Sequence, residues 1–182
     1  MKILKVLLFF VGSLIVLLLV VALFVKKEIA VEREITIAKP NKEVFEYIKL
    51  IKNQDNYSVW NKKDPNSKKT YTGTDGTVGF VATWDSENND VGMGEQEIKK
   101  IVEGERIDTE LRFKKPMEAT DYAYFTTVAS DSTHTTVKWG FTGKMPYPFN
   151  LMGLFINMNE MLGKDLSGGL ANLKEVLEKQ TN

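Results

Sequence analysis

The sequence contains no cysteine and only one histidine among its 182 residues. The absence of cysteine excludes disulfide bonds, thiolate chemistry, cysteine-based metal sites and a lipoprotein attachment site. The one histidine, His134, lies in an Asp-Ser-Thr-His-Thr stretch typical of a hairpin turn, where we expect an exposed residue. A catalytic triad or a metal centre would need that histidine in a cleft with partners. We therefore expect no cofactor, no metal and no catalytic histidine.

The chain also lacks a net charge, because 24 Lys and Arg residues balance 24 Asp and Glu residues. No basic cluster stands out along the sequence, and a near-neutral domain without one binds nucleic acid poorly. Neither an internal repeat nor a low-complexity stretch is present. These absences favour an ordinary globular domain that does not bind nucleic acid.

One long uncharged run, from Val6 to Val25, stands near the N-terminus. As a helix, at ~1.5 Å per residue, it would span roughly 30 Å, the hydrocarbon thickness of a bilayer. A cleaved signal peptide is the alternative, but such a peptide has an apolar core of roughly 7 to 15 residues and small residues before the cleavage site. Both are missing here. We predict an uncleaved transmembrane anchor over residues 1–27, closed by Lys26 and Lys27.

The orientation of this anchor is not fixed by charge, because lysines lie on both of its sides. We expect a single-pass membrane protein whose domain lies on the outer side, periplasmic or extracellular. Its oligomeric state is not apparent from the sequence.

Residues 28–182 are enough for one domain. Alternating residues from Ala30 to Ala38 predict a first strand, and Pro40-Asn41 then starts a short helix, with the proline in its first turn and Asn41 as its cap. Between Lys68 and Lys144 the period of two, interrupted by turn signals, predicts about six more strands. A leucine-rich stripe predicts a long helix from near Asn150. The expected class is α+β, with an antiparallel sheet of about seven strands.

Three alternations and one pair of glycines allow sharper predictions. Val78, Phe80, Ala82 and Trp84 should share one strand face, as should Ile107, Thr109, Leu111 and Phe113. In the last strand, Val137, Trp139 and Phe141 should be buried, and Lys138 and Thr142 should not. Gly168 and Gly169 cost about 1 kcal/mol each inside a helix, so a close approach, a kink or a bound molecule must justify them.

The order of these elements and several stretches resemble the SRPBCC (START/Bet v 1-like) superfamily, nearest to its polyketide cyclase/dehydrase-like branch. The stretches are Ser58–Pro65, Val78–Trp84, Gly143–Pro146, Phe149–Met152 and Gly168–Lys174, and the resemblance covers roughly residues 29–178. It implies a helix-grip fold, in which a curved antiparallel sheet wraps the C-terminal helix and leaves an apolar cavity. Members bind lipids, sterols, polyketides or other hydrophobic small molecules, and a minority catalyse cyclisation or dehydration.

Aromatic and methionine side chains at predicted inward positions are the candidate ligand-binding residues, with one tyrosine added to orient a ligand. They are Trp60, Phe80, Trp84, Phe113, Tyr124, Trp139, Phe141, Met145, Phe155 and Met158. Each is equally typical of an ordinary core, and a cavity of this fold is lined by core-type residues. Tyr122 and Arg112 are further candidates for orienting a ligand. We expect the cavity between the C-terminal helix and the concave sheet face, bordered by Trp84, Trp139, Phe155 and Met158.

Three further patterns are better explained by ordinary strands and turns than by a catalytic or ion-binding site. Glu95 and Glu97 could form an acid–base pair, but alternating Glu and Lys residues are more typical of a solvent-facing strand. The acidic stretch from Asp85 to Asp90 lacks the turn glycine and final glutamate of a calcium loop. The glycines from Gly73 to Gly79 lack the lysine and helix of a phosphate-binding loop.

Three hypotheses follow. The first is a membrane-anchored protein that binds a hydrophobic small molecule or lipid. The second is a cyclase- or dehydratase-type enzyme acting on such a ligand, for which an acid and a base should converge in the cavity. The third is an envelope interaction protein with a filled core. Cavity volume separates the third from the others, and buried groups of perturbed pKa separate the second from the first.

Overall fold

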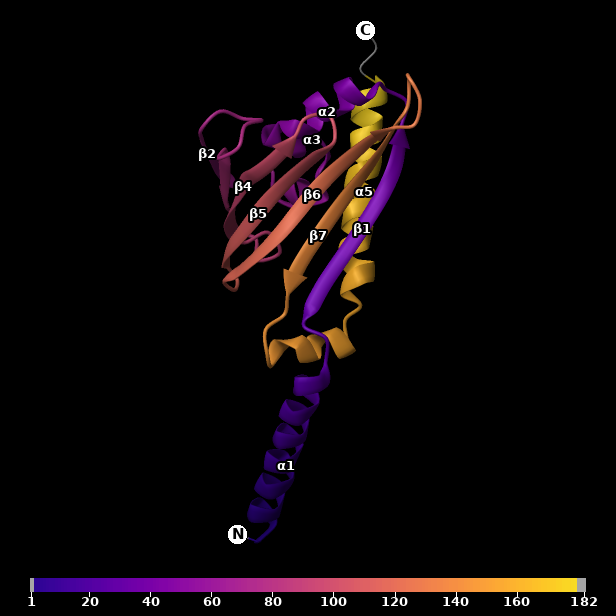
Figure 1. The fold of residues 1–182 in the computed structure, drawn as a ribbon. Coiled ribbons are helices and arrows are strands. Elements are labelled where there is room, and N and C mark those ends of the chain that lie inside the picture. The colour runs from indigo at the N-terminus through magenta and orange to yellow at the C-terminus, as the bar shows by residue number, and fades with distance from the viewer. Residues whose placement is uncertain (1, 180–182) are drawn as a thin grey trace.

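A seven-stranded antiparallel sheet and a long C-terminal helix form the domain in the computed structural model, which describes residues 2–179 (Figure 1). Residue 1 and residues 180–182, at the end of the expected domain, lie outside the described residues. The strands are β1 (Glu28–Ile37), β2 (Lys68–Thr72), β3 (Val81–Asp85), β4 (Met93–Val102), β5 (Arg106–Lys115), β6 (Ala119–Ala129) and β7 (Thr135–Lys144). Their order across the sheet is β1-β7-β6-β5-β4-β3-β2.

Helices precede, interrupt and follow this sheet. They are α1 (Lys2–Phe24), α2 (Asn41–Lys49), α3 (Gln54–Tyr57), α4 (Val59–Lys63) and α5 (Met158–Lys179), with the 3-10 helices η1 (Ile51–Asn53) and η2 (Phe149–Leu154). Helix α5 packs along β1, α2 and α3 lie across the end of the sheet remote from α1 (Figure 1), and α4 contacts α3 and α5. The α+β class, the strand number and the helix-grip arrangement expected from the sequence are confirmed.

The pairing register gives every strand an inner and an outer face. Trp139 of β7 lies against Gly169 of α5, so its face is the inner one. Opposite Trp139 on the flanking strands are Arg33 and Phe125, which therefore share that face. Val137 and Trp139 are buried and Lys138 is partly exposed, as predicted. Phe141 packs against the core but is only partly buried, as is Thr142, so this part of the prediction does not hold.

The core lies where α2, α3 and α5 meet the inner face. Its fully buried side chains include Val44, Phe45 and Ile48 of α2 and Leu166, Leu170 and Leu173 of α5. These positions recur at steps of one, three or four, so one stripe of each helix meets the sheet. Burying each such side chain contributes about 1.5–3 kcal/mol.

The C-terminal helix begins later than predicted, at Met158 rather than near Asn150. The Asn157 side chain accepts a hydrogen bond from the backbone N–H of Glu160 at 3.1 Å, which is the geometry of a helix N-cap. The stretch before it forms η2, and both Leu154 and Phe155 are exposed there rather than facing the sheet. The expectation that Phe155 lies between helix and sheet is therefore wrong.

Two smaller expectations also fail. Val78 is exposed, because β3 begins only at Val81 and the residues before it belong to the glycine-rich turn after β2. Asn41 does not cap α2; its side-chain amide donates instead to the carbonyl oxygen of Gly104 at 2.7 Å. The cap position is held by Pro40, which has no side-chain hydrogen bond to offer.

Helix α1 projects from the end of the domain where β1 begins and β7 ends (Figure 1). Only Ala22 of this helix is buried. Within residues 2–179, α1 is the one helix long and apolar enough to cross a membrane, and a signal sequence would have the same character. The side of a membrane on which the domain lies does not follow from the fold.

Candidate functional site: a pocket where the apolar helix meets the domain

An open pocket of about 480 Å³ lies at the junction between α1 and the domain. Its wall comes from the start of β1, the residue after β7 and the segment between η2 and α5. The lining residues are Val25, Lys26, Lys27, Glu28, Ile29, Ala30, Val31, Met145, Gly153, Leu154, Phe155, Ile156, Asn157, Met158 and Asn159. Most are apolar, and the two lysines stand on the α1 side.

Backbone and amide hydrogen bonds hold these segments together. The backbone N–H of Met145 donates to the carbonyl oxygen of Lys27 at 2.8 Å. The side-chain amide of Asn150, which is fully buried, donates to the carbonyl oxygens of Ala22 at 2.7 Å and Val25 at 2.9 Å. These two acceptors belong to the last turn of α1, where carbonyls lack helical partners. The pocket wall is therefore fastened directly to the end of α1.

A guanidinium lies next to two pocket residues on the inner face. The Nη2 atom of Arg33 donates to Asn159, to the backbone oxygen at 3.0 Å and to Oδ1 at 2.9 Å. Gly163 leaves the space for this group, because an added Cβ there would lie 2.0 Å from Nη2. Among residues 2–179, no carboxylate lies within ion-pair distance of Arg33. Its charge is thus held by neutral acceptors alone.

Three of the ten predicted ligand-binding residues, Met145, Phe155 and Met158, line this pocket. Trp84, Phe113 and Phe141 instead lie on the inner sheet face, partly exposed, with the Trp84 and Phe113 rings 5.8 Å apart. The indole N–H of Trp84 donates to the carbonyl oxygen of Val91 at 3.1 Å.

The remaining inward aromatic residues fill the core. Trp139 contacts the rings of Tyr57, Trp60 and Phe125, with centroids 5.8, 6.0 and 4.7 Å apart respectively. Phe80 is buried and stacks on Tyr71. The expected border of Trp84, Trp139, Phe155 and Met158 is therefore divided: the last two line the pocket and the first two do not.

Tyr124, Tyr122 and Arg112 lie on the outer face and not toward the concave side. The Tyr124 hydroxyl donates to Oε2 of Glu32 at 2.5 Å, and this bond lowers the pKa of Glu32. The sequence predicts Tyr124 in the cavity, but Phe125 faces inward, and its neighbour Tyr124 must therefore face outward. Tyrosine is common on both faces of a sheet, and its residue type alone does not assign a face.

Arg112 holds the acidic cluster of the outer face together. Its guanidinium contacts Glu95 at 2.6 Å, Glu97 at 2.7 Å and Glu110. These hydrogen bonds lower the pKa values of Glu95 and Glu97. Both carboxylates therefore stay ionised at neutral pH, which does not suit a general acid.

Asp121 is a partly buried acid that the sequence did not single out. It lies on the inner face opposite Gly143 and accepts a hydrogen bond from the backbone N–H of Lys144 at 3.3 Å. Burial raises the pKa of its carboxyl above the usual range. Its signal in the sequence is an acid at an odd-numbered position of β6, where Ala123 and Phe125 mark the buried face.

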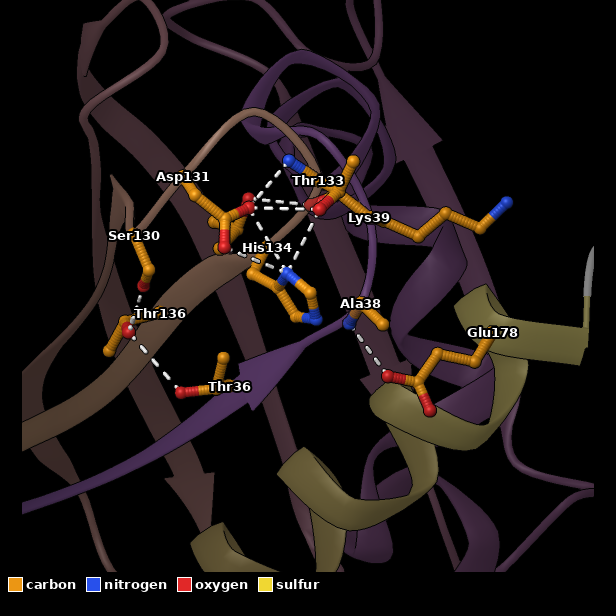
Figure 2. A network of polar contacts seen from close by, with 10 residues as sticks. Thr36, Ala38, Lys39, Ser130, Asp131, Thr133, His134, Thr136 and Glu178 are labelled. Atoms are coloured by element: carbon orange, nitrogen blue, oxygen red, sulfur yellow. Dashed lines mark hydrogen bonds and ion pairs between the residues drawn. The ribbon is translucent and has the colours of Figure 1, made fainter.

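His134 belongs to a turn network at the end of the sheet remote from α1. Figure 2 shows the Asp131 carboxylate between the Thr133 hydroxyl and the His134 ring, 2.9 and 3.0 Å away. The N–H and hydroxyl of Thr133, together with His134, lower the pKa of Asp131 to about 2. Nearby, Glu178 of α5 accepts from the backbone N–H of Ala38 at 2.7 Å (Figure 2). The network fixes a turn and is remote from the pocket.

A second pocket, of about 760 Å³, is lined by polar and charged residues of the loops that flank β2 and β3. Within it the hydroxyl of Ser86 donates to the carboxylate of Asp64. Throughout residues 2–179, no group of three or more His, Asp or Glu residues is placed to hold a metal ion. This polar pocket does not match an apolar ligand.

The chain matches the family described as "Polyketide cyclase / dehydrase and lipid transport" over residues 28–178, and it belongs to that family. No match was found among curated proteins.

Similar solved structures share the fold at low sequence identity. The protein XoxI from Bacillus cereus is 15% identical, with a TM-score of 0.59 over 84% of this chain and 99% of that one. Norcoclaurine synthase from Thalictrum flavum, solved in complex with dopamine and hydroxybenzaldehyde, is 8% identical, with a TM-score of 0.59 over 85% and 89%. Ara h 8.0201 is 14% identical, with a TM-score of 0.54 over 84% and 99%.

Proposed function

We propose that this member of the polyketide cyclase / dehydrase and lipid transport family is a membrane-anchored protein that binds a hydrophobic small molecule or lipid. In this proposal α1, within residues 1–27, is the membrane span, and residues 28–182 form the binding domain on the outer side. The ligand enters the pocket at the junction of the two. The observation that carries the proposal is this position, because the pocket wall includes the last residues before the domain, Val25 to Lys27.

The chemistry of the lining supports an apolar ligand with a polar or anionic end. Ile29, Val31, Leu154 and Met158 offer apolar surface, and its burial against a ligand contributes about 25 cal/mol per Å². The volume lies in the usual range for small-molecule sites, roughly 300–1,000 Å³. The flexible methionines suit ligands of variable shape.

Cations at the rim favour one orientation of the ligand. Lys26 and Lys27 line the α1 side of the pocket together with one carboxylate, Glu28. Arg33 lies outside the lining, donates to the lining residue Asn159 and has no carboxylate partner in the described chain. An anionic headgroup at this level and an acyl chain among the apolar side chains would satisfy both parts of the site.

An enzymatic role is favoured less. Asp121 is a candidate acid on the inner face, but a cyclase or dehydratase also needs a base near it, and its one hydrogen bond comes from the Lys144 backbone. The Glu95–Glu97 pair is on the outer face under Arg112 and does not converge with it. The site favours binding over catalysis.

Native mass spectrometry of the detergent-extracted full chain tests the proposal. We expect a bound apolar molecule on the wild-type chain. Gly153 lines the pocket, and an added Cβ there meets no atom within 4 Å, so a side chain can start from this position without a backbone clash, and Gly153→Trp is designed to occupy the pocket. This variant should lose the bound molecule while its thermal unfolding midpoint stays near that of the wild type.

Val128→Trp is the matched control, since Val128 is exposed on β6 near the turn remote from α1. It should keep the bound molecule. Equal occupancy in wild type and Gly153→Trp, or no apolar molecule on the wild-type chain even after incubation with lipid, would count against the proposal.

A further inference from the structure

We infer that residues 147–156, called here the interfacial strip, form a second membrane contact that lies in the bilayer interface beside α1. The strip joins β7 to α5 and contains η2. The inference rests on the proposal that α1 spans a membrane. It adds a surface that a simple tether would not require, because a helix alone suffices to hold a domain at a bilayer.

The strip gathers several exposed apolar side chains within ten consecutive residues. Its exposed members are Tyr147, Phe149, Met152, Leu154, Phe155 and Ile156. Phe155 is the extreme, with 81% of its surface exposed. The other exposed large apolar residues of the domain come from separate segments; they are Leu50, Tyr71, Val78, Met117, Tyr122, Val128 and Met161, the last just beyond the strip in α5. Clustered exposed apolar surface marks an interaction site, whereas scattered residues need no explanation.

Two contacts set the depth of the strip relative to α1. Asn150, in the middle of the strip, is fully buried and bonds the carbonyl oxygens of Ala22 and Val25. If α1 spans the hydrocarbon, its last turn lies at the hydrocarbon edge, and the strip must lie at the same level. Figure 1 shows η2 lying across the end of α1, between that helix and the sheet.

The occupant that fits this surface is the bilayer that surrounds α1. The apolar surface of α1 ends at the exposed Phe24 and continues directly into the strip. Lys26 and Lys27 stand at this level, where lysines near the end of a membrane helix extend toward the headgroups. Tyr147 has the amphipathic ring enriched at membrane interfaces. Interfacial helices bury their apolar face in the boundary between headgroups and acyl chains, roughly 5–10 Å deep, and the strip offers apolar surface at that level.

The strip has a consequence for the pocket. Leu154, Phe155 and Ile156 belong both to the strip and to the pocket lining. With the strip in the interface, the opening of the pocket would be held at the lipid surface. Tethering by α1 alone would not fix this position. A ligand could then pass between leaflet and pocket without crossing water.

Single-cysteine labelling tests the inference, because the natural chain has no cysteine to compete. Full-length variants Met152→Cys and Phe155→Cys, labelled with the fluorophore NBD, are reconstituted into phosphatidylcholine–phosphatidylglycerol vesicles with and without doxyl-labelled lipid. Leu14→Cys in α1 reports insertion of the span, and Val128→Cys is the matched exposed control. We expect blue-shifted emission and strong doxyl quenching at positions 14, 152 and 155, and neither at position 128.

The outcomes separate the strip from the anchor. Quenching at 14 without quenching at 152 and 155 would overturn the strip and leave the anchor intact. Absence of quenching at 14 would overturn both. A blue shift at 152 and 155 that depends on protein concentration and not on doxyl lipid would assign the strip to a second copy of the chain, which also overturns the inference. A further label is placed at position 149 by Phe149→Cys. Doxyl quenching of this label should be weaker when the same chain also carries Met152→Ser and Phe155→Ser.

Discussion

The indole of Trp139 occupies the place that a side chain at Gly169 would need, since an added Cβ would lie 2.5 Å from its Cζ3 atom. Here α5 approaches the sheet so closely that only glycine fits. The core at this level is filled by an aromatic ring, and the glycine serves packing instead of making room for a bound molecule. The cost of a helical glycine, about 1 kcal/mol relative to Ala, is offset by this contact.

Replacing Gly169 with Ala should therefore destabilise the domain by about 1–3 kcal/mol, because Trp139 or α5 must shift. Gly168→Ala is the matched control: its Cβ would meet only Val59 Cγ2 at 3.1 Å. The free energy of unfolding of this control variant should lie within about 1 kcal/mol of the wild-type value. Urea unfolding of the full chain in detergent measures both. Two results would contradict this explanation of Gly169. In the first, Gly169→Ala lowers the free energy of unfolding no more than Gly168→Ala does. In the second, adding Trp139→Phe to Gly169→Ala recovers none of the lost stability.

The outer acidic cluster should carry a pH-dependent share of stability. Arg112 lowers the pKa values of Glu95 and Glu97, so their contribution is present above the ordinary carboxyl range and is lost as pH falls through the folded-state values. Arg112→Met should lower the free energy of unfolding at pH 7 by about 1–2 kcal/mol, a modest figure because these groups are partly exposed. The difference from wild type should shrink below about pH 4.

Arg112→Lys should recover part of this loss, since a single ammonium cannot serve three carboxylates as a planar guanidinium does. A loss that stays constant from pH 7 to pH 3 would mean that Arg112 stabilises through packing of its stem and not through charge.

The contribution of Asp121 to stability should depend on pH in the opposite direction to that of Glu95 and Glu97. Burial raises the pKa of its carboxyl in the folded state. Its favourable contribution is therefore complete below the unfolded pKa and is lost as pH rises through the folded value. Asp121→Asn keeps an oxygen for the Lys144 N–H and should gain about 0.5–1 kcal/mol at pH 7. The gain should vanish on acidification. A substantial loss at pH 7 would show that the ionised carboxylate has a partner that stabilises it.

Much of the sheet could be predicted because its residues obey a period of two. Val137, Trp139 and Phe141 alternate with polar residues, and the turn signals between strands are strong. This period did not identify the face on which Tyr124 lies, because an amphipathic ring suits either face of a sheet. Its outward position follows only from its place next to the inward-facing Phe125. Asp121 was missed for a related reason, since a single acid between apolar positions is typical of an exposed strand as well.

The start of the last helix could not be predicted from its apolar stripe. Leu151, Leu154 and Phe155 continue the helical spacing, but Asn157 and Glu160 are the capping pair that begins α5 after them. The pocket depends on this break, because the segment before the cap turns toward α1 instead of along the sheet. Which apolar side chains line a pocket and which fill a core is decided by packing between distant segments, which no local pattern reports.

The central claim is that an apolar molecule occupies the pocket beside α1, and methionine methyl NMR tests it most directly. Met145 and Met158 line the pocket, while Met93 at the start of β4 and Met117 in the turn between β5 and β6 do not line it and serve as internal controls. The full chain, labelled with 13C at its methionine methyl groups and held in lipid nanodiscs, is titrated with a nitroxide-labelled fatty acid. The account predicts saturable broadening of the Met145 and Met158 signals with Met93 and Met117 unchanged, and loss of that broadening in Gly153→Trp. Saturable broadening at Met93 with Met145 and Met158 unaffected, or no saturable effect at any of the four, would contradict it.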